Sequence, residues 1–181
     1  MIYIVRHGQT DWNLLHKVQG RMDIELNQTG IEQAKELAQK LAGIKFDICF
    51  SSPLQRALKT AQTIYNGPIQ IDARIIERGN GDLEGRTDWK ELGVNYYDPN
   101  ENRFNIETLP EMQNRLQPFW EEVLEKYPNQ NVLVVTHAGT AMWTQVYFYG
   151  FPPENDFNKY RLDNCEVLQI DNMTKPLGFK L

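Results

Sequence analysis

Ile2-Tyr3-Ile4-Val5-Arg6-His7-Gly8, close to the start of the chain, joins an apolar run to a cation, an imidazole and a glycine. A short apolar run of this kind predicts a buried β-strand. Groups that follow it directly lie at the C-terminal edge of a sheet, where open α/β folds keep their active sites. The pattern recurs at Val132-Leu133-Val134-Val135, which leads into Thr136-His137-Ala138-Gly139. The two histidines therefore predict one shared pocket.

A third strand is predicted at Asp47-Ile48-Cys49-Phe50, which leads into Ser51-Ser52-Pro53-Leu54-Gln55-Arg56-Ala57. We expect Ser52 to cap a helix, because Pro53 suits the first helical position and Gln55 completes a capping box. Arg56 then lies in the first turn, where free amide donors and the helix dipole favour an anion. Four side chains together predict a dianion pocket that contains a nucleophile: Arg6, Arg56, His7 and His137.

Predicted strands and helices alternate along the chain, which is typical of a largely parallel sheet covered on both faces. A chain of 181 residues with 41% hydrophobic content can bury one sizeable core, so we expect one domain over residues 1–181. The expected fold is α/β, a three-layer α/β/α sandwich with a mostly parallel sheet. Strands are predicted near 2–5, 47–51, 69–71, 131–136 and 165–171, and helices near 29–41, 53–65, 109–127 and 138–149.

Two local patterns refine these helices. Thr29-Gly30-Ile31-Glu32 has the form of a capping box, so the second helix is expected to open at Thr29 and to run to about Leu41. Pro118 lies inside the predicted helix 109–127, where it removes a hydrogen bond and should kink or split the helix.

The charge and the sequence ends restrict the class of protein. A net charge of −5 makes a general polyanion-binding role and a nucleic acid partner improbable, so any affinity for phosphate must be local to the pocket. Met1 leads straight into the first strand, without a basic leader or a long hydrophobic span, which predicts a cytoplasmic protein without membrane contact. The two cysteines and three histidines show no metal-ligand spacing, so neither a metal nor another cofactor is expected.

The motifs occur in a fixed order over almost the whole chain. They are Arg6 to Asn13, Gln19-Gly20, Leu26, Thr29-Gly30, Ser51 to Ala57, Thr60-Ala61, Glu77, Gly81, Glu84-Gly85, Thr136 to Gly139 and Asn164-Cys165. This ordered set resembles the histidine phosphatase superfamily, also called phosphoglycerate mutase-like. The stretch from Glu77 to Gly85 looks more like the phosphatase branch than like the mutases.

The resemblance implies roles for individual residues. His7 corresponds to the nucleophile that forms a phosphohistidine intermediate, and nearby arginines favour its neutral form. Arg6 and Arg56 would hold the phosphoryl oxygens with their planar forks of donors. Glu77 occupies the position of the proton donor, which would protonate the leaving oxygen and then activate water. His137 is a further catalytic residue, expected to contact the phosphate and to stabilise the transferring group, and substrate contacts are expected from Asn13, Gln19, Gly20 and Ala138.

Each of these side chains also has an ordinary structural interpretation. Arg56 in a first helical turn could make a surface salt bridge, and Glu77 could pair with Arg74 or Arg78. Asn13 could be a loop or capping residue. A capped or core histidine would be the default for either histidine alone, and only their paired context favours catalysis.

We therefore expect a metal-independent phosphomonoester hydrolase. Two alternatives stay open: a phosphoglycerate mutase-type phosphoryl transferase, and a non-catalytic regulator that binds a phosphorylated ligand. A small substrate-side loop or cap is expected at about residues 78–108, where aromatic residues could surround an organic leaving group. The expected partner is a small phosphorylated metabolite, with a phosphoprotein as the alternative.

Overall fold

A five-stranded sheet forms the centre of the protein, shown by a computed structural model that describes residues 1–98 and 101–179. The strand order is β3-β2-β4-β1-β5. Four strands are parallel to their neighbours, and β5 alone pairs antiparallel, at the edge beside β1. The strands are β1 (Ile2–Arg6), β2 (Ile48–Ser51), β3 (Ile69–Ile71), β4 (Val132–Thr136) and β5 (Val167–Ile170).

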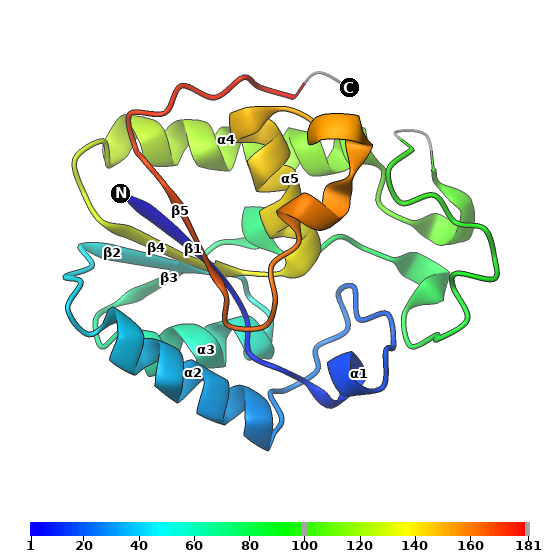
Figure 1. Ribbon diagram of the computed structural model, residues 1–181, viewed down its shortest axis with the longest axis horizontal. Helices are drawn as coiled ribbons and strands as arrows, with labels where there is room; N and C mark the ends of the chain where they lie inside the picture. The colour runs from blue at the N-terminus through cyan, green and yellow to red at the C-terminus, as the bar shows by residue number, and fades with distance from the viewer. Residues whose placement is uncertain (99–100, 180–181) are drawn as a thin grey trace.

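Helices cover both faces of this sheet (Figure 1). Helices α2 (Gln28–Leu41) and α3 (Gln55–Ile64) pack on one face, and α4 (Leu109–Lys126) and α5 (Ala138–Tyr149) pack on the other. The expected single-domain α/β/α sandwich with a mostly parallel sheet is confirmed. The short elements are α1 (Asp11–Leu14) and the 3-10 turns η1 (Ala73–Ile75), η2 (Gly81–Leu83), η3 (Arg103–Asn105), η4 (Pro153–Asn155) and η5 (Phe157–Tyr160).

The strands are apolar on both sides because each side meets a helical layer. In β1, Ile2 and Ile4 belong to the cluster under α4 and α5, which includes Phe119. Tyr3 and Val5 point the other way, into the cluster under α2 and α3. This alternation with a period of two is the ordinary geometry of a strand, and it explains the unbroken apolar run at the start of the chain.

The helix caps differ from those predicted. Asn27, rather than Thr29, caps α2, and its side chain accepts a hydrogen bond from the backbone N–H of Gly30. The expected cap by Ser52 is also wrong, because α3 begins only at Gln55 and its N-cap residue, Leu54, makes no side-chain cap hydrogen bond. The Ser52 hydroxyl lies 2.7 Å from His137 Nε2 instead. Ser52, before this helix, therefore contacts the histidine at the end of the neighbouring strand β4.

Pro118 does not split its helix. Helix α4 runs without a break from Leu109 to Lys126. Leu116 and Trp120, on either side of the proline, are fully buried, and the Trp120 indole donates a hydrogen bond of 3.0 Å to Thr144 Oγ1 on α5. This packing holds the helix together across the position where proline removes one backbone donor.

Some expectations concern regions that the structure describes only in part. The segment at about 78–108 includes Pro99 and Asn100, which lie outside the described residues. Its described part contains the short turns η2 and η3 and no longer helix or strand. Across residues 1–98 and 101–179, no helix is long and apolar enough to cross a membrane.

Two glycines allow the loop after β1 to lie directly on the N-terminus of α2. A Cβ atom at Gly30 would lie 2.1 Å from the carbonyl oxygen of Gln9, and one at Gly8 would lie 2.4 Å from the carbonyl oxygen of Gly30. Gln9 also accepts a backbone hydrogen bond from Asn27 and donates one to Gln33 Oε1. The loop that carries the first histidine is therefore fixed to a helix end by backbone contacts that leave no room for a side chain.

We predict that Gly30→Ala lowers the free energy of unfolding by about 1–3 kcal/mol, because the added methyl group must displace backbone atoms. Gly43→Ala is the matched control, since nothing lies within 4 Å of a Cβ atom at that position. Urea denaturation of both variants measures the difference. Equal stabilities would show that the loop does not depend on this contact.

Candidate active site

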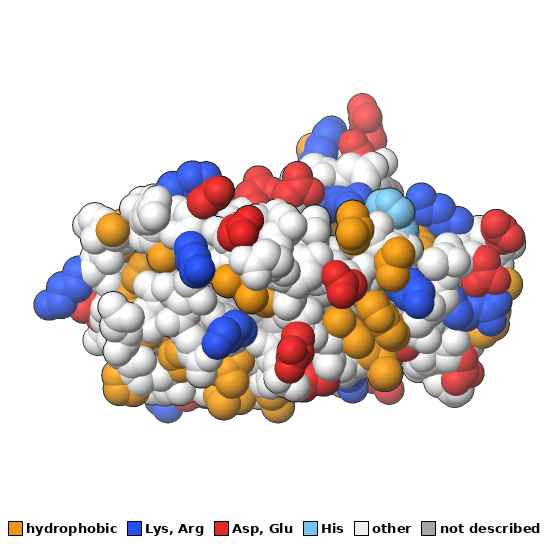
Figure 2. Space-filling view, turned by 90° about the horizontal axis from the view of Figure 1, so that it is seen from below, with side chains coloured by type: hydrophobic (Ala, Val, Ile, Leu, Met, Phe, Trp, Pro, Cys, Tyr) orange, Lys and Arg blue, Asp and Glu red, His pale blue; other side chains and the backbone are white. Residues whose placement is uncertain are grey.

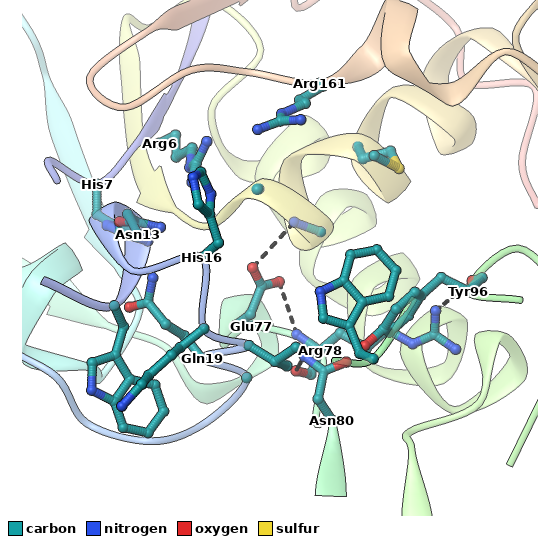
Figure 3. A pocket seen from close by; sticks show the side chains of 18 of the residues that line it. Arg6, His7, Asn13, His16, Gln19, Glu77, Arg78, Asn80, Tyr96 and Arg161 are labelled. Carbon is teal, nitrogen blue, oxygen red and sulfur yellow. Dashed lines mark hydrogen bonds between the residues drawn. The ribbon is translucent and has the colours of Figure 1, made fainter. Parts of the chain in front are cut away.

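The ends of three neighbouring parallel strands bring the candidate residues together. Arg6 at the end of β1 is in register with Thr136 at the end of β4, so His7 and His137 leave the sheet side by side. Their ring centroids are 5.1 Å apart. Strand β2 lies on the other side of β4, and the chain beyond it supplies Arg56. Figure 3 shows this region from close by.

His7 is held as a neutral ring whose Nε2 lone pair points toward Arg56. Its Nδ1 lies 2.7 Å from the carbonyl oxygen of Gly8, and Arg56 Nε donates to its Nε2 over 3.3 Å. A carbonyl can only accept and a guanidinium can only donate, so the proton is on Nδ1 and the lone pair is on Nε2. Burial, followed by the charges of Arg56 and Arg6, lowers the pKa of His7 well below its ordinary value. A deprotonated nitrogen is therefore available as a nucleophile.

Arg56 is fully buried, which excludes the surface salt bridge considered above. Its Nη1 donates to the carbonyl oxygen of Met22 over 2.7 Å, and its Nη2 donates to that of Gly20 over 2.8 Å. Burial lowers its pKa to about 10, against the opposing effect of Glu77, so the guanidinium stays charged at neutral pH. Asp23 accepts from the backbone N–H of Gln55 and so fixes the turn that carries Arg56.

Arg6 lies at the end of β1, with 8% of its surface exposed. Its Nη1 donates to the carbonyl oxygen of Leu162 over 2.7 Å. Its Nε is buried and has no partner among the described residues. Burial lowers the pKa of Arg6, and Glu77 acts in the opposite direction. The site thus contains two buried guanidinium groups whose charges no carboxylate in the described part of the chain neutralises by direct contact.

His137 lies beside His7 at the end of β4, fully buried, and is not among the residues that line the cavity. Its Nε2 lies 2.7 Å from Ser52 Oγ, whereas its buried Nδ1 has no hydrogen-bond partner in the part of the chain that the structure describes. Burial, followed by the charge of Arg56, lowers the pKa of His137 well below its ordinary value. An unsatisfied ring nitrogen beside the first histidine is able to contact a bound ligand.

Glu77 is positioned by backbone donors. Its carboxylate accepts hydrogen bonds from the N–H groups of Arg78, Gly139 and Thr140, at 2.9, 3.2 and 3.1 Å. Gly139 and Thr140 belong to the first turn of α5, where free N–H groups favour an anion. The guanidinium of Arg74 pairs with Asp72 and Glu122 instead. Glu77 is therefore free of the salt bridges that its neighbours suggested, and it lies at the centre of the pocket in Figure 3.

The four remaining candidates all line the same cavity, but their contacts differ. Asn13 Oδ1 accepts from the backbone N–H of Thr10 and Gln19 Oε1 accepts from Thr10 Oγ1, so each side-chain amide keeps its nitrogen for a ligand. Gly20 holds Arg56 through its carbonyl oxygen and thus acts on the site through another residue. Ala138 is the first residue of α5.

The cavity has a volume of about 610 Å³ and extends well beyond these residues. Trp89, Tyr96 and Tyr97 from the expected cap segment line it. So do several residues that sequence reasoning did not assign to the site: His16, Arg78, Asn80 and Arg161. Arg161 lies three residues before the Asn164-Cys165 motif. This proximity was the one feature of the sequence that pointed to Arg161 as a site residue.

The positive charge of the site is local. Over the face drawn in Figure 2, the side chains of lysine and arginine are interspersed with those of aspartate and glutamate. The whole chain carries a net charge of −5. Among the described residues, no group of three or more His, Cys, Asp or Glu is arranged to hold a metal ion.

Comparisons with known proteins agree with this geometry. The chain is 39% identical over 150 residues to the uncharacterized phosphatase PhoE of Bacillus subtilis, covering 80% of this chain and 76% of that protein. It is 33% identical over 180 residues to putative phosphoserine phosphatase 2 of Hydrogenobacter thermophilus, with coverages of 93% and 88%.

A solved structure of a phosphoserine phosphatase mutant from Entamoeba histolytica, in complex with phosphoserine, matches with a TM-score of 0.78. It shares 30% sequence identity and covers 92% of this chain and 87% of its own. The family description "Histidine phosphatase superfamily (branch 1)" matches residues 2–175. Because that match spans nearly the whole chain, the protein belongs to branch 1 of the histidine phosphatase superfamily.

Proposed function

We propose that the protein is a metal-independent phosphomonoester hydrolase that works through a phosphohistidine on His7. One observation carries this proposal: the lone pair of His7 Nε2 lies in a buried pocket whose cations suit a phosphoryl group. Arg6 and Arg56 would hold the phosphoryl oxygens, and fixed charges in a dry site stabilise them more strongly than water does. The unsatisfied His137 Nδ1 and the side-chain amide of Asn13 would complete the contacts.

In the first step, His7 Nε2 attacks phosphorus and the bond from phosphorus to the ester oxygen breaks. The leaving oxygen takes a proton from the carboxyl group of Glu77, and the alcohol departs. The phosphoryl group stays on His7, and Glu77 becomes a carboxylate. The N–H groups of Gly139 and Thr140 then stabilise this charged form.

In the second step, Glu77 takes a proton from a water molecule as the water attacks phosphorus. The bond between His7 and phosphorus breaks, inorganic phosphate forms, and both side chains return to their starting states. No metal ion takes part, because the arginines supply the positive charge.

The proposed substrate is a small phosphorylated metabolite. The cavity of about 610 Å³ has the size of a small-molecule site. Solved relatives from Entamoeba histolytica bind phosphoserine and 3-phosphoglyceric acid. Trp89, Tyr96 and Tyr97 of the segment at about 78–108 line the cavity, and we propose this segment as the substrate-side cap. A phosphoprotein remains the alternative partner.

We predict that His7→Ala lowers hydrolysis of p-nitrophenyl phosphate on the order of 10⁴-fold or more, because it removes the nucleophile. The native chain keeps its activity in excess chelator. Lys35→Ala on α2 is the control, because this exposed side chain does not line the cavity. Phosphate release measures all three. Loss of activity in chelator, with recovery on adding magnesium or zinc, would contradict the mechanism.

Glu77→Gln tests the proton donor. The amide cannot supply the proton, so kcat/KM for an alkyl phosphate should fall about 10²–10⁴-fold. The loss should be smaller for p-nitrophenyl phosphate, because its leaving group departs without protonation. Steady-state kinetics with both substrates give the comparison. Equal losses would assign Glu77 a structural role.

Nitrogen NMR of ¹⁵N-histidine-labelled protein should show the rings of His7 and His137 in the neutral form, with one protonated nitrogen each, at pH 5.5. Burial and Arg56 keep both pKa values well below 6.5. In the unfolded chain the same rings gain protons below about pH 6.5. The unfolded state then binds more protons, so the free energy of unfolding falls as the pH drops below that value. Imidazolium signals from either ring at pH 5.5 would contradict this assignment.

A further inference from the structure

Arg161 differs from every other arginine of the chain. Its guanidinium group has no hydrogen-bond acceptor and no ion-pair partner among residues 1–98 and 101–179. The other arginines each donate at least one side-chain hydrogen bond to a protein oxygen: Arg6, Arg21, Arg56, Arg74, Arg78, Arg86, Arg103 and Arg115. Its side chain is exposed, so water can hydrate this guanidinium, which is free to meet a ligand.

The position of Arg161 suggests a role in ligand binding. It lines the cavity, and Figure 3 shows its guanidinium directed toward Arg6. The next residue, Leu162, supplies the carbonyl oxygen that holds Arg6. Beyond the main effect of burial, the charge of Arg161 also lowers the pKa of Arg6, so the two cations repel each other. An anion bound between or beside them would relieve that repulsion.

The backbone that carries Arg161 is firmly fastened. Its N–H donates to the carbonyl oxygen of Asn158, and Gln145 Nε2 donates to that of Tyr160 over 2.6 Å. Phe157 stacks on Tyr97, with ring centroids 4.1 Å apart and planes within 4°. These contacts join the segment before β5 both to α5 and to the cap segment. Arg161 therefore starts from a fixed point on the cavity wall.

We propose that Arg161 binds a carboxylate carried by the substrate, so that the pocket selects phosphomonoesters of small carboxylic acids. This inference rests on the proposed function and names the substrate class of the same site. Around His7, the phosphoryl group already has donors from Arg6, Arg56, His137 and Asn13. A single planar guanidinium fork matches a carboxylate with two parallel hydrogen bonds. Lys17 and Lys90 also line the cavity, but a lysine ammonium offers no such planar fork.

The test uses O-phosphoserine and O-phosphoethanolamine, which differ only by the carboxylate. Each competes with p-nitrophenyl phosphate in the native chain, and the two inhibition constants are compared. A charge-assisted hydrogen bond predicts that phosphoserine binds about 10–100-fold more tightly. In Arg161→Ala this ratio should fall toward one. Arg161→Lys should give an intermediate ratio, because it keeps the charge and loses the fork.

Lys159→Ala is the matched control. It removes the same charge two residues away, on an exposed side chain that does not line the cavity. Lys159→Ala should keep the native ratio of inhibition constants. If the ratio falls as far as in Arg161→Ala, the preference comes from long-range charge, and the proposed contact is wrong. Equal weakening of both compounds in Arg161→Ala, or no preference in the native chain, would also overturn the proposal.

Binding measurements separate this proposal from the proposed function. Calorimetry of the same two compounds on His7→Ala reports on the carboxylate contact without turnover. If the native chain releases no phosphate from any ester, the hydrolase mechanism fails. The calorimetric preference and its loss in the double variant His7→Ala, Arg161→Ala would still decide the role of Arg161.

Discussion

The parallel pairing of β1 with β4 is the constraint on which the site depends. Because Arg6 is in register with Thr136, the residue after each strand emerges at the same height, and the two imidazoles meet. A slip of one residue would turn every side chain of β1 to the opposite helical layer. The core therefore fixes the register, because both faces of the strand are buried. The same packing fixes the positions of the two histidines.

The N-termini of α3 and α5 position the other charged groups of the site. The first turn of α5 donates backbone N–H groups to Glu77, and the first turn of α3 presents Arg56. A helix end offers free donors and a favourable dipole without a mobile side chain. The acid and the cation are thus set at known positions around His7, and most of their contacts are with backbone atoms. Such contacts do not depend on rotamers, so the geometry exists before any ligand arrives.

The sequence predicted the elements better than their ends. Apolar runs bounded by polar residues locate strands such as β1 and β4, because a strand that is buried on both faces is apolar at every position. Caps are harder, since Ser52 had the right neighbours for a helix cap but bonds to His137, which is far away in the sequence and follows the adjacent strand β4. Pro118 failed as a helix breaker for a related reason, because tertiary packing outweighed a local preference. Arg161 was missed because its position on the cavity wall arises from loop contacts that have no periodicity.

Burial of cations beside a neutral imidazole has a cost in the empty protein. Desolvation opposes the charges of Arg6 and Arg56, and His137 keeps an unsatisfied nitrogen. A dianion would offset these penalties together, because it supplies both the missing charge and the missing acceptors. The same groups that weaken the free fold thus provide the free energy for binding. Such a dianion would contact groups that the described part of the chain leaves without a partner.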